Sequence, residues 1–253
     1  MPAARTNLSI FAKFNFRYKP AGIKFALTRP EGMEPLDRKL AFCEILKEAL
    51  QSQKPFYFAK EHEDCFGKAI LGMVQEDQSL GESGIIGYKW GIFQEPRANG
   101  RLYHRNFHLG KGTVKYVALA PFDQLTFDPD LLLIMATPEQ AEIVLRASSY
   151  ATGELYESKS SPVLGCSWLT TYPFMSGKIN YLLTNLQTHG MKGRQAFPDG
   201  WVLISIPFDR LSSVADGLRE MKWDLPEYSA GRDYFLKERD RILAEALKEM
   251  GKS

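Results

Sequence analysis

Cysteine is scarce in this sequence, because 253 residues contain only three, at positions 43, 65 and 166. So small and odd a number does not form the disulfide framework of a small secreted domain, and we expect reduced thiols in a cytoplasmic protein. Long apolar runs are also missing. The longest strongly apolar stretch, Leu131–Ala136, is far shorter than the roughly 20 residues of a membrane-spanning helix. The first 20 residues hold no apolar segment of signal-peptide length, so neither export nor membrane insertion is expected.

The sequence also has no excess of charge of one sign. Its 32 basic and 30 acidic residues give a net charge of +2, which predicts no broad attraction to nucleic acid or to anionic membranes. The aromatic residues are scattered and do not alternate with a basic stripe, so we expect no nucleic-acid partner. A hydrophobic content of 44% is ordinary for a soluble chain. The length allows one large domain or two closely packed halves.

Helical and strand periodicities alternate along the chain. Thr137-Pro138-Glu139-Gln140 has the pattern of a capping box with proline at the first helical position, so a helix should begin there. Glycines are frequent between Gln75 and Gly112, which predicts irregular, ligand-facing loops. The other expected elements are a short helix at Leu8–Tyr18, a helix from Leu36 to Ser52, strands at Ala21–Leu27, Pro55–Ala59, Val114–Leu119, Leu131–Ala136, Ile179–Asn185 and Trp201–Ile206, and a helical stripe at Leu211–Met221.

Two parts of the chain have the same order of segments. Gly153–Tyr172 echoes Lys54–Met73, and each of these segments contains one cysteine. The matched tyrosines 57 and 156 are 99 residues apart, the cysteines 65 and 166 are 101 apart, and the prolines 121 and 207 of two PFD motifs are 86 apart. The pattern predicts an α+β fold of two pseudo-symmetric strand–helix–strand–strand units with mixed sheets, related by a pseudo-twofold axis, plus a C-terminal helix.

This organisation predicts three regions. Residues 1–127 would form the first unit with an entry arm and a glycine-rich insertion, residues 128–225 the second unit, and residues 226–253 a docking helix. The apolar side of Arg232–Met250 is too narrow to stand alone in water, so we expect it to dock. Docking on its own chain is the favoured outcome, with Trp223 and Tyr228 covering the connection. Docking on a second subunit remains open, so the protein would be a monomer or a homodimer.

Several of these segments together resemble a known family. The strings KPAGIKF, FCEILKEA, KPFYFAKEHEDCFGKAILGM, DPDLLLIMATPEQAEIVLRA and GMKGR are similar to the uncharacterised prokaryotic family called domain of unknown function 169. The resemblance covers about residues 8–215. It implies a soluble protein, often from anaerobic bacteria and archaea, with no established activity. It also implies cysteines at the positions of Cys43, Cys65 and Cys166, and often a fourth cysteine where this chain has Met191.

The three cysteines are the candidates for a metal site. Thiolates are soft ligands for zinc or for an iron–sulfur cluster, and three of them could be completed by His62, His189 or Met191. No local C-x-x-C pair is present, so the fold would have to bring Cys43, Cys65 and Cys166 together. Buried thiols without a ligand are the alternative.

Two further groups of residues suggest other chemistry. Gly190, Lys192, Gly193 and Arg194 form a turn that could present backbone N–H groups and two cations to an anion, although a hairpin turn with exposed cations explains it as well. His62 could act as the base for a nucleophilic Cys65, although a solvated acidic turn explains EHED as well.

These observations favour a cytoplasmic protein that binds a metal centre or a small anionic cofactor in a cleft between its halves. A cysteine-dependent enzyme acting on a small substrate and an interaction subunit that docks through its last helix are the alternatives.

Overall fold

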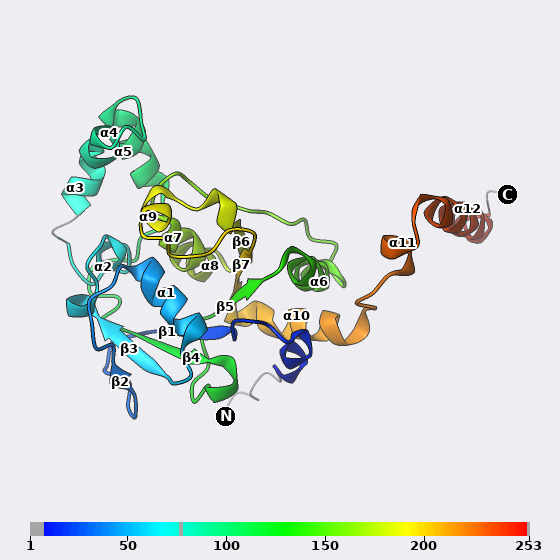
Figure 1. Cartoon of the computed structure of the whole chain (residues 1–253), viewed down its shortest axis with the longest axis horizontal. Helices are drawn as coiled ribbons and strands as arrows, with labels where there is room; N and C mark the ends of the chain where they lie inside the picture. The colour runs from blue at the N-terminus through cyan, green and yellow to red at the C-terminus, as the bar shows by residue number, and fades with distance from the viewer. Residues whose placement is uncertain (1–7, 76–77, 252–253) are drawn as a thin grey trace.

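The structure, a computed structural model, describes residues 8–75 and 78–251. Its centre is one seven-stranded mixed sheet with the strand order β2-β3-β4-β1-β5-β7-β6 (Figure 1). The expected α+β class, with mixed strands and a C-terminal helix, is confirmed. The strands are β1 (Ala21–Ala26), β2 (Glu34–Pro35), β3 (Phe56–Ala59), β4 (Tyr116–Pro121), β5 (Leu131–Ala136), β6 (Asn180–Leu183) and β7 (Val202–Pro207).

The strand order places the two halves of the chain on either side of the β1–β5 pair, and the expected pseudo-twofold symmetry stays a prediction. At the centre, β1 pairs antiparallel with β5, and each of them pairs on its other side with the last strand of its own half, β4 or β7. Pro121 lies opposite Ala21 and Pro207 lies opposite Leu131, so the two PFD motifs end equivalent strands. The matching of Tyr57 with Tyr156 is wrong. Tyr57 lies in β3, whereas Tyr156 lies outside any strand, and β6 is the strand that pairs with β7 as β3 pairs with β4.

The helices do not follow the same symmetry. Helix α1 (Phe42–Gln51) packs on the sheet face that carries Leu131 and Leu133, whereas α6 (Pro138–Ser149) and α10 (Phe208–Glu220) pack on the opposite face. Because neighbouring side chains of a strand point to opposite faces, β5 is buried on both sides, as its unbroken apolar sequence predicts. After α6 the chain returns to the α1 face, where α7 (Gly165–Leu169) and α8 (Thr171–Ser176) precede β6.

Of three helix starts, those of α6 and of the entry helix agree with the sequence prediction and that of α1 does not. Thr137 Oγ1 accepts the Gln140 N–H at 3.3 Å and Gln140 Oε1 accepts the Thr137 N–H at 3.0 Å, so the predicted capping box forms. The entry segment forms a 3₁₀ helix, η1 (Ser9–Phe14), whose apolar side chains are buried as expected. Helix α1 begins at Phe42, later than the predicted Leu36, because the Leu36 N–H donates to Tyr57 O at 2.8 Å and the Leu40 N–H donates to His62 O at 3.0 Å.

The glycine-rich insertion is helical, which corrects the prediction of loops. After the one-turn helix α2 (Gly67–Ile70), it forms α3 (Gln78–Ser83), α4 (Ile85–Lys89) and α5 (Pro96–Arg105), which pack on one another (Figure 1). We call residues 78–105 the cap. Its glycines allow the helices to touch, since a Cβ on Gly81 would lie 2.2 Å from the Tyr103 ring. At its base, the Leu109 N–H donates to Ile70 O and the Gly112 N–H to Gly72 O, each at 2.8 Å.

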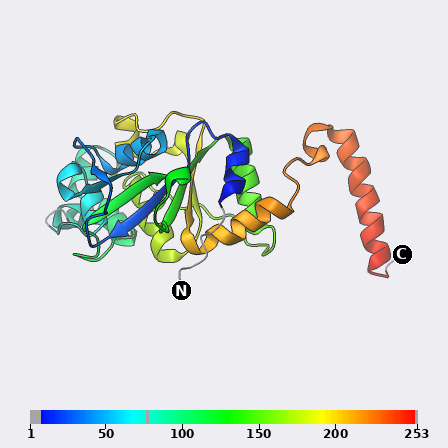
Figure 2. The same ribbon diagram turned by 90° about the horizontal axis from the view of Figure 1, so that it is seen from below.

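The C-terminal helix α12 (Arg232–Glu249) stands apart from the sheet and its covering helices (Figure 2). None of its side chains is buried, so the expectation that it docks on its own chain is wrong. Trp223 does not cover the connection, because its ring stacks on Phe14 of η1 at 4.3 Å. Several charges of α12 pair within the helix, as Arg241 does with Glu238 and Glu245. Among residues 8–75 and 78–251, no helix combines the length and apolarity needed to cross a membrane.

Candidate functional site

The three cysteines line one pocket of about 490 Å³. Cys43 is the second residue of α1, Cys65 lies two residues before α2, and Cys166 is the second residue of α7. The fold therefore brings together three segments that are far apart in the sequence, and all three thiols are free. The pocket lies between elements of the first half and elements of the second.

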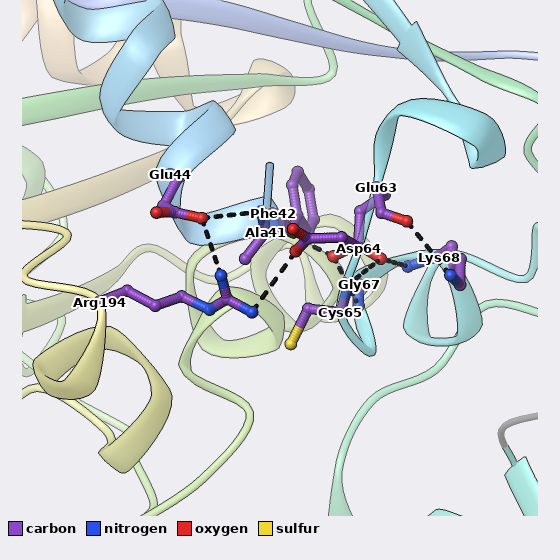
Figure 3. Close-up of polar contacts among 9 residues, drawn as sticks. All are labelled: Ala41, Phe42, Glu44, Glu63, Asp64, Cys65, Gly67, Lys68 and Arg194. Carbon is purple, nitrogen blue, oxygen red and sulfur yellow. Dashed lines mark hydrogen bonds and ion pairs between the residues drawn. The ribbon is translucent and has the colours of Figure 1, made fainter. Parts of the chain in front are cut away.

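Glu63 organises this end of the pocket (Figure 3). Its side chain is buried and accepts four backbone hydrogen bonds. Oε1 accepts the N–H groups of Phe42 at 3.0 Å and Gly67 at 3.2 Å, and Oε2 accepts those of Cys65 at 3.0 Å and Lys68 at 3.2 Å. One carboxylate thus ties the Cys65 segment to the first turn of α1, which carries Cys43. Burial raises the pKa of Glu63, although the N–H groups of Lys68, Cys65 and Phe42 act in the opposite direction.

The prediction of a solvated acidic turn at EHED is therefore wrong for Glu63, whose exposed fraction is 2%. Glu63 cannot be singled out from the sequence, because its neighbours Glu61 and Asp64 are exposed and nothing in the string EHED distinguishes the buried glutamate. What identifies Glu63 is that two helices begin beside it, at Phe42 and Gly67, with N–H groups that have no acceptor within their own helix. This arrangement is visible only in the fold.

Two glycines allow the walls of the pocket to approach each other. A Cβ on Gly67 would lie 2.5 Å from the Phe42 Cβ, and a Cβ on Gly165 would lie 2.8 Å from the Met191 sulfur. Neither distance is compatible with a side chain unless a neighbour moves. Gly165 thereby places the buried Met191 thioether beside the backbone that carries Cys166.

The surroundings raise the pKa of all three thiols. Burial, with a smaller effect from the charge of Cys65, raises the pKa of Cys43 to about 12. Burial and the Glu63 carboxylate raise the pKa of Cys65. The pKa of Cys166 is raised well above its usual value by burial, with smaller contributions from Cys43 and Cys65. Because ionised thiols here would repel one another, a positive charge among them would remove the repulsion.

The geometry does not favour the pairing of Cys65 with His62. The Nδ1 atom of His62 accepts the Ala59 N–H at 3.0 Å, and His62 is not among the residues that line the pocket. A nucleophilic thiol needs a lowered pKa, and that of Cys65 is raised.

The predicted turn at Gly190–Arg194 is mostly helix, because α9 spans His189–Gly193. Gly190 and Arg194 line the pocket, whereas Lys192 and Gly193 do not. The Arg194 guanidinium lies 3.1 Å from a Glu44 oxygen and 3.4 Å from an Asp64 oxygen (Figure 3). Two carboxylates therefore already surround the cation that was expected to hold an anion.

Within residues 8–75 and 78–251, no three side chains of His, Cys, Asp or Glu are grouped so that they could hold a metal ion as they stand. Met191 is the other sulfur-containing residue in the pocket wall. The pocket continues from the sulfur atoms towards the cap, where Trp90 at the end of α4 meets His189 with 5.0 Å between ring centres.

The match to known families covers the sheet, the pocket and the cap. A family model, domain of unknown function 169 with the description uncharacterised ArCR, matches residues 10–217. The chain belongs to this family. No curated protein and no solved structure matches the chain.

Every residue that lines the pocket lies inside the matched range of the DUF169 family, whereas α12 lies outside it. The family has no assigned activity, so the chemistry of the pocket has to be argued from its own residues.

Proposed function

We propose that this DUF169 protein binds a thiolate-coordinated metal centre in the pocket, with Cys43, Cys65 and Cys166 as ligands. The observation that carries the proposal is that all three cysteines of the chain, from three separate segments, line one pocket. Chance burial of three unrelated thiols would not require them to share a cavity. Met191 adds a fourth sulfur to the same wall.

The electrostatics of the thiols support a cation as their partner. Burial raises all three pKa values, and the charge of neighbouring thiolates adds to this for Cys43 and Cys166. Metal binding replaces the thiol protons and its positive charge cancels the repulsion between the thiolates. Sulfur ligands select soft metals, which include zinc, copper(I) and the iron of iron–sulfur clusters.

Of the two expected centres, an iron–sulfur cluster suits the pocket better than zinc. A structural zinc site has four ligands close around one ion, whereas a cluster distributes its cysteines over several irons. The cavity of about 490 Å³ is also far larger than one ion. With three cysteines, one iron of a four-iron cluster would face the open part of the pocket and could accept a ligand from outside the chain.

The test is purification without oxygen, followed by the absorption spectrum and by iron, sulfide and zinc analysis. We expect broad visible absorption with about four irons per chain, lost in each of the single variants Cys43→Ser, Cys65→Ser and Cys166→Ser. Met191→Leu tests the fourth sulfur, and Met221→Leu, at a buried methionine of the other core, is its control. Protein that carries no metal after anaerobic purification and takes up none on reconstitution with iron and sulfide would refute the proposal.

A further inference from the structure

The part of the pocket beyond the cysteines is mostly apolar. The cap contributes Leu80, Ile86 and Trp90, and the segment before α7 contributes Val163 and Leu164. A cavity of about 490 Å³ with such walls falls in the range of pockets that enclose small organic molecules. A metal centre at the cysteines would leave this part unfilled.

The Arg and Lys side chains that line the pocket already have partners. Arg194 lies against Glu44 and Asp64. Lys68 donates from Nζ to the backbone oxygen of Glu63 at 3.1 Å, and its charge acts on the Glu63 carboxylate. A ligand with a net charge would therefore have to displace an existing partner. This arrangement disfavours the small anionic cofactor that the sequence suggested.

An aromatic pair forms one side of the opening. The Trp90 and His189 rings lie 5.0 Å apart with 31° between their planes, so the cap meets α9 through ring contact. Trp90 is 61% exposed although it lines the pocket. A large aromatic side chain that is both exposed and part of a cavity wall offers its face to a flat partner.

We propose that the pocket binds an uncharged, flat and mainly apolar small molecule between Trp90 of the cap and the cysteine end. This inference rests on the proposed function only because both use the same pocket, and it holds whether or not a metal is present. The bound molecule would lie next to the three cysteines, which also line this pocket.

A pair of fluorescent probes tests the size, shape and charge of the ligand. 1-Anilinonaphthalene is uncharged and carries a flat naphthalene ring system, and its 8-sulfonate differs by one anionic group. We expect the full-length protein to bind one molecule of 1-anilinonaphthalene, and to bind the sulfonate at least about tenfold more weakly, since desolvating the anion without a free cation is costly. Equal or tighter binding of the sulfonate would refute the uncharged class.

Substitutions of single residues show where in the protein the probe binds. Trp90→Ala should weaken binding of 1-anilinonaphthalene about tenfold, and Trp90→Phe should recover most of the affinity, because a ring still offers a stacking face. Tyr228→Ala is the matched control, since Tyr228 is 63% exposed and does not line the pocket. An unchanged affinity in Trp90→Ala would overturn the assignment of the site.

Chemical labelling provides an independent measurement. Bound 1-anilinonaphthalene should slow the alkylation of Cys65 by N-ethylmaleimide at least about fivefold in metal-free wild-type protein, because probe and reagent share the pocket. Unchanged alkylation would contradict the proposal.

The metal-centre proposal and the small-molecule proposal can be refuted independently of each other. Probe binding to metal-free protein would support the inference without the metal centre, and a Trp90→Ala protein with full iron content but no change in probe affinity would leave only the metal centre.

Discussion

The Glu63 carboxylate accepts the Phe42 N–H at 3.0 Å, across 21 residues of sequence. Phe42 is the first residue of α1, so its N–H is one of the groups at the helix start that no residue of the helix can satisfy. Ala41, which precedes it, has no side-chain acceptor. A buried glutamate from another segment therefore caps the helix on which Cys43 lies.

Removing this carboxylate should destabilise the fold strongly. Glu63→Ala leaves four buried or partly buried N–H groups without their acceptor, and we expect a loss of about 3 kcal/mol in the free energy of unfolding. Glu63→Gln should cost less, because one side-chain oxygen remains. The measurement is urea denaturation, with Glu61→Ala at an exposed position as the control, expected to change stability by less than about 0.5 kcal/mol. Equal effects of Glu63→Ala and Glu61→Ala would contradict the capping role.

A methyl group on Gly165 should push α9 away from α7. Its Cβ would lie 2.7 Å from the Thr188 methyl group and 2.8 Å from the Met191 sulfur, so we expect Gly165→Ala to cost about 2 kcal/mol. Gly193→Ala is the matched control, since a Cβ added there would have no atom within 4 Å, and its stability should stay level or rise. The measurement is thermal unfolding of both variants and of the wild type. A Gly165→Ala protein as stable as the wild type would mean that α9 moves freely.

His108 should make stability depend on pH. Burial lowers its pKa below the usual 6.5, with a smaller effect from His104 in the same direction. Between the lowered folded value and about 6.5, the unfolded chain binds more protons than the folded chain, so the free energy of unfolding rises with pH across this window. The stabilising effect is complete above about pH 6.5 and is lost as pH falls.

The check on His108 is urea denaturation at a series of pH values from about 5 to 8, which spans the window in which the residue titrates. In His108→Gln the part of the slope due to this residue should disappear. His104→Gln, at an exposed position, should change the slope much less, because burial is the main cause of the lowered pKa of His108. Identical slopes in wild type and His108→Gln would show that the residue is not desolvated.

Deleting residues 232–253 should leave the stability of the remaining chain unchanged. Helix α12 buries none of its side chains, so its removal takes away no part of the core. We expect a melting temperature within about 2 °C of the full chain, since 1 kcal/mol shifts that of a chain this long by about 2–4 °C. A larger fall, measured by circular dichroism at several protein concentrations, would mean that α12 packs on the body or on a second copy in solution.

The sequence predicts the parts of the fold in which local pattern and tertiary packing agree. Leu131–Ala136 is apolar throughout and is buried on both faces, and Thr137 with Gln140 starts α6 as predicted. The similarity of Gly153–Tyr172 to Lys54–Met73 is misleading, because the two segments share composition but not secondary structure. Residues 154–161 carry no strand, and Ser158 instead donates from its hydroxyl to Tyr181 O at the edge of β6.

The candidate site was only partly predictable. The three cysteines could be proposed as partners, but their meeting depends on where α1, α2 and α7 begin relative to one another. The cap was missed because glycine disfavours helices in isolation, whereas here Gly81 and Gly100 allow close helix contact that offsets this cost. The carboxylates that pair with Arg194 belong to residues 44 and 64, far from it in the sequence. Without the fold, Arg194 looked like a free cation and was therefore predicted to bind an anion.

The central position of β1 has a consequence for how the protein folds. Strand β1 pairs with β4, which begins at Tyr116, 90 residues after β1 ends at Ala26. It also pairs with β5, which begins at Leu131. Pairings of such high contact order form slowly, because a long loop must close before they contribute stability. Cys166 joins the other two cysteines only when the second half of the sheet has assembled. The proposed metal centre, which needs all three thiols, would therefore be loaded only at the end of folding.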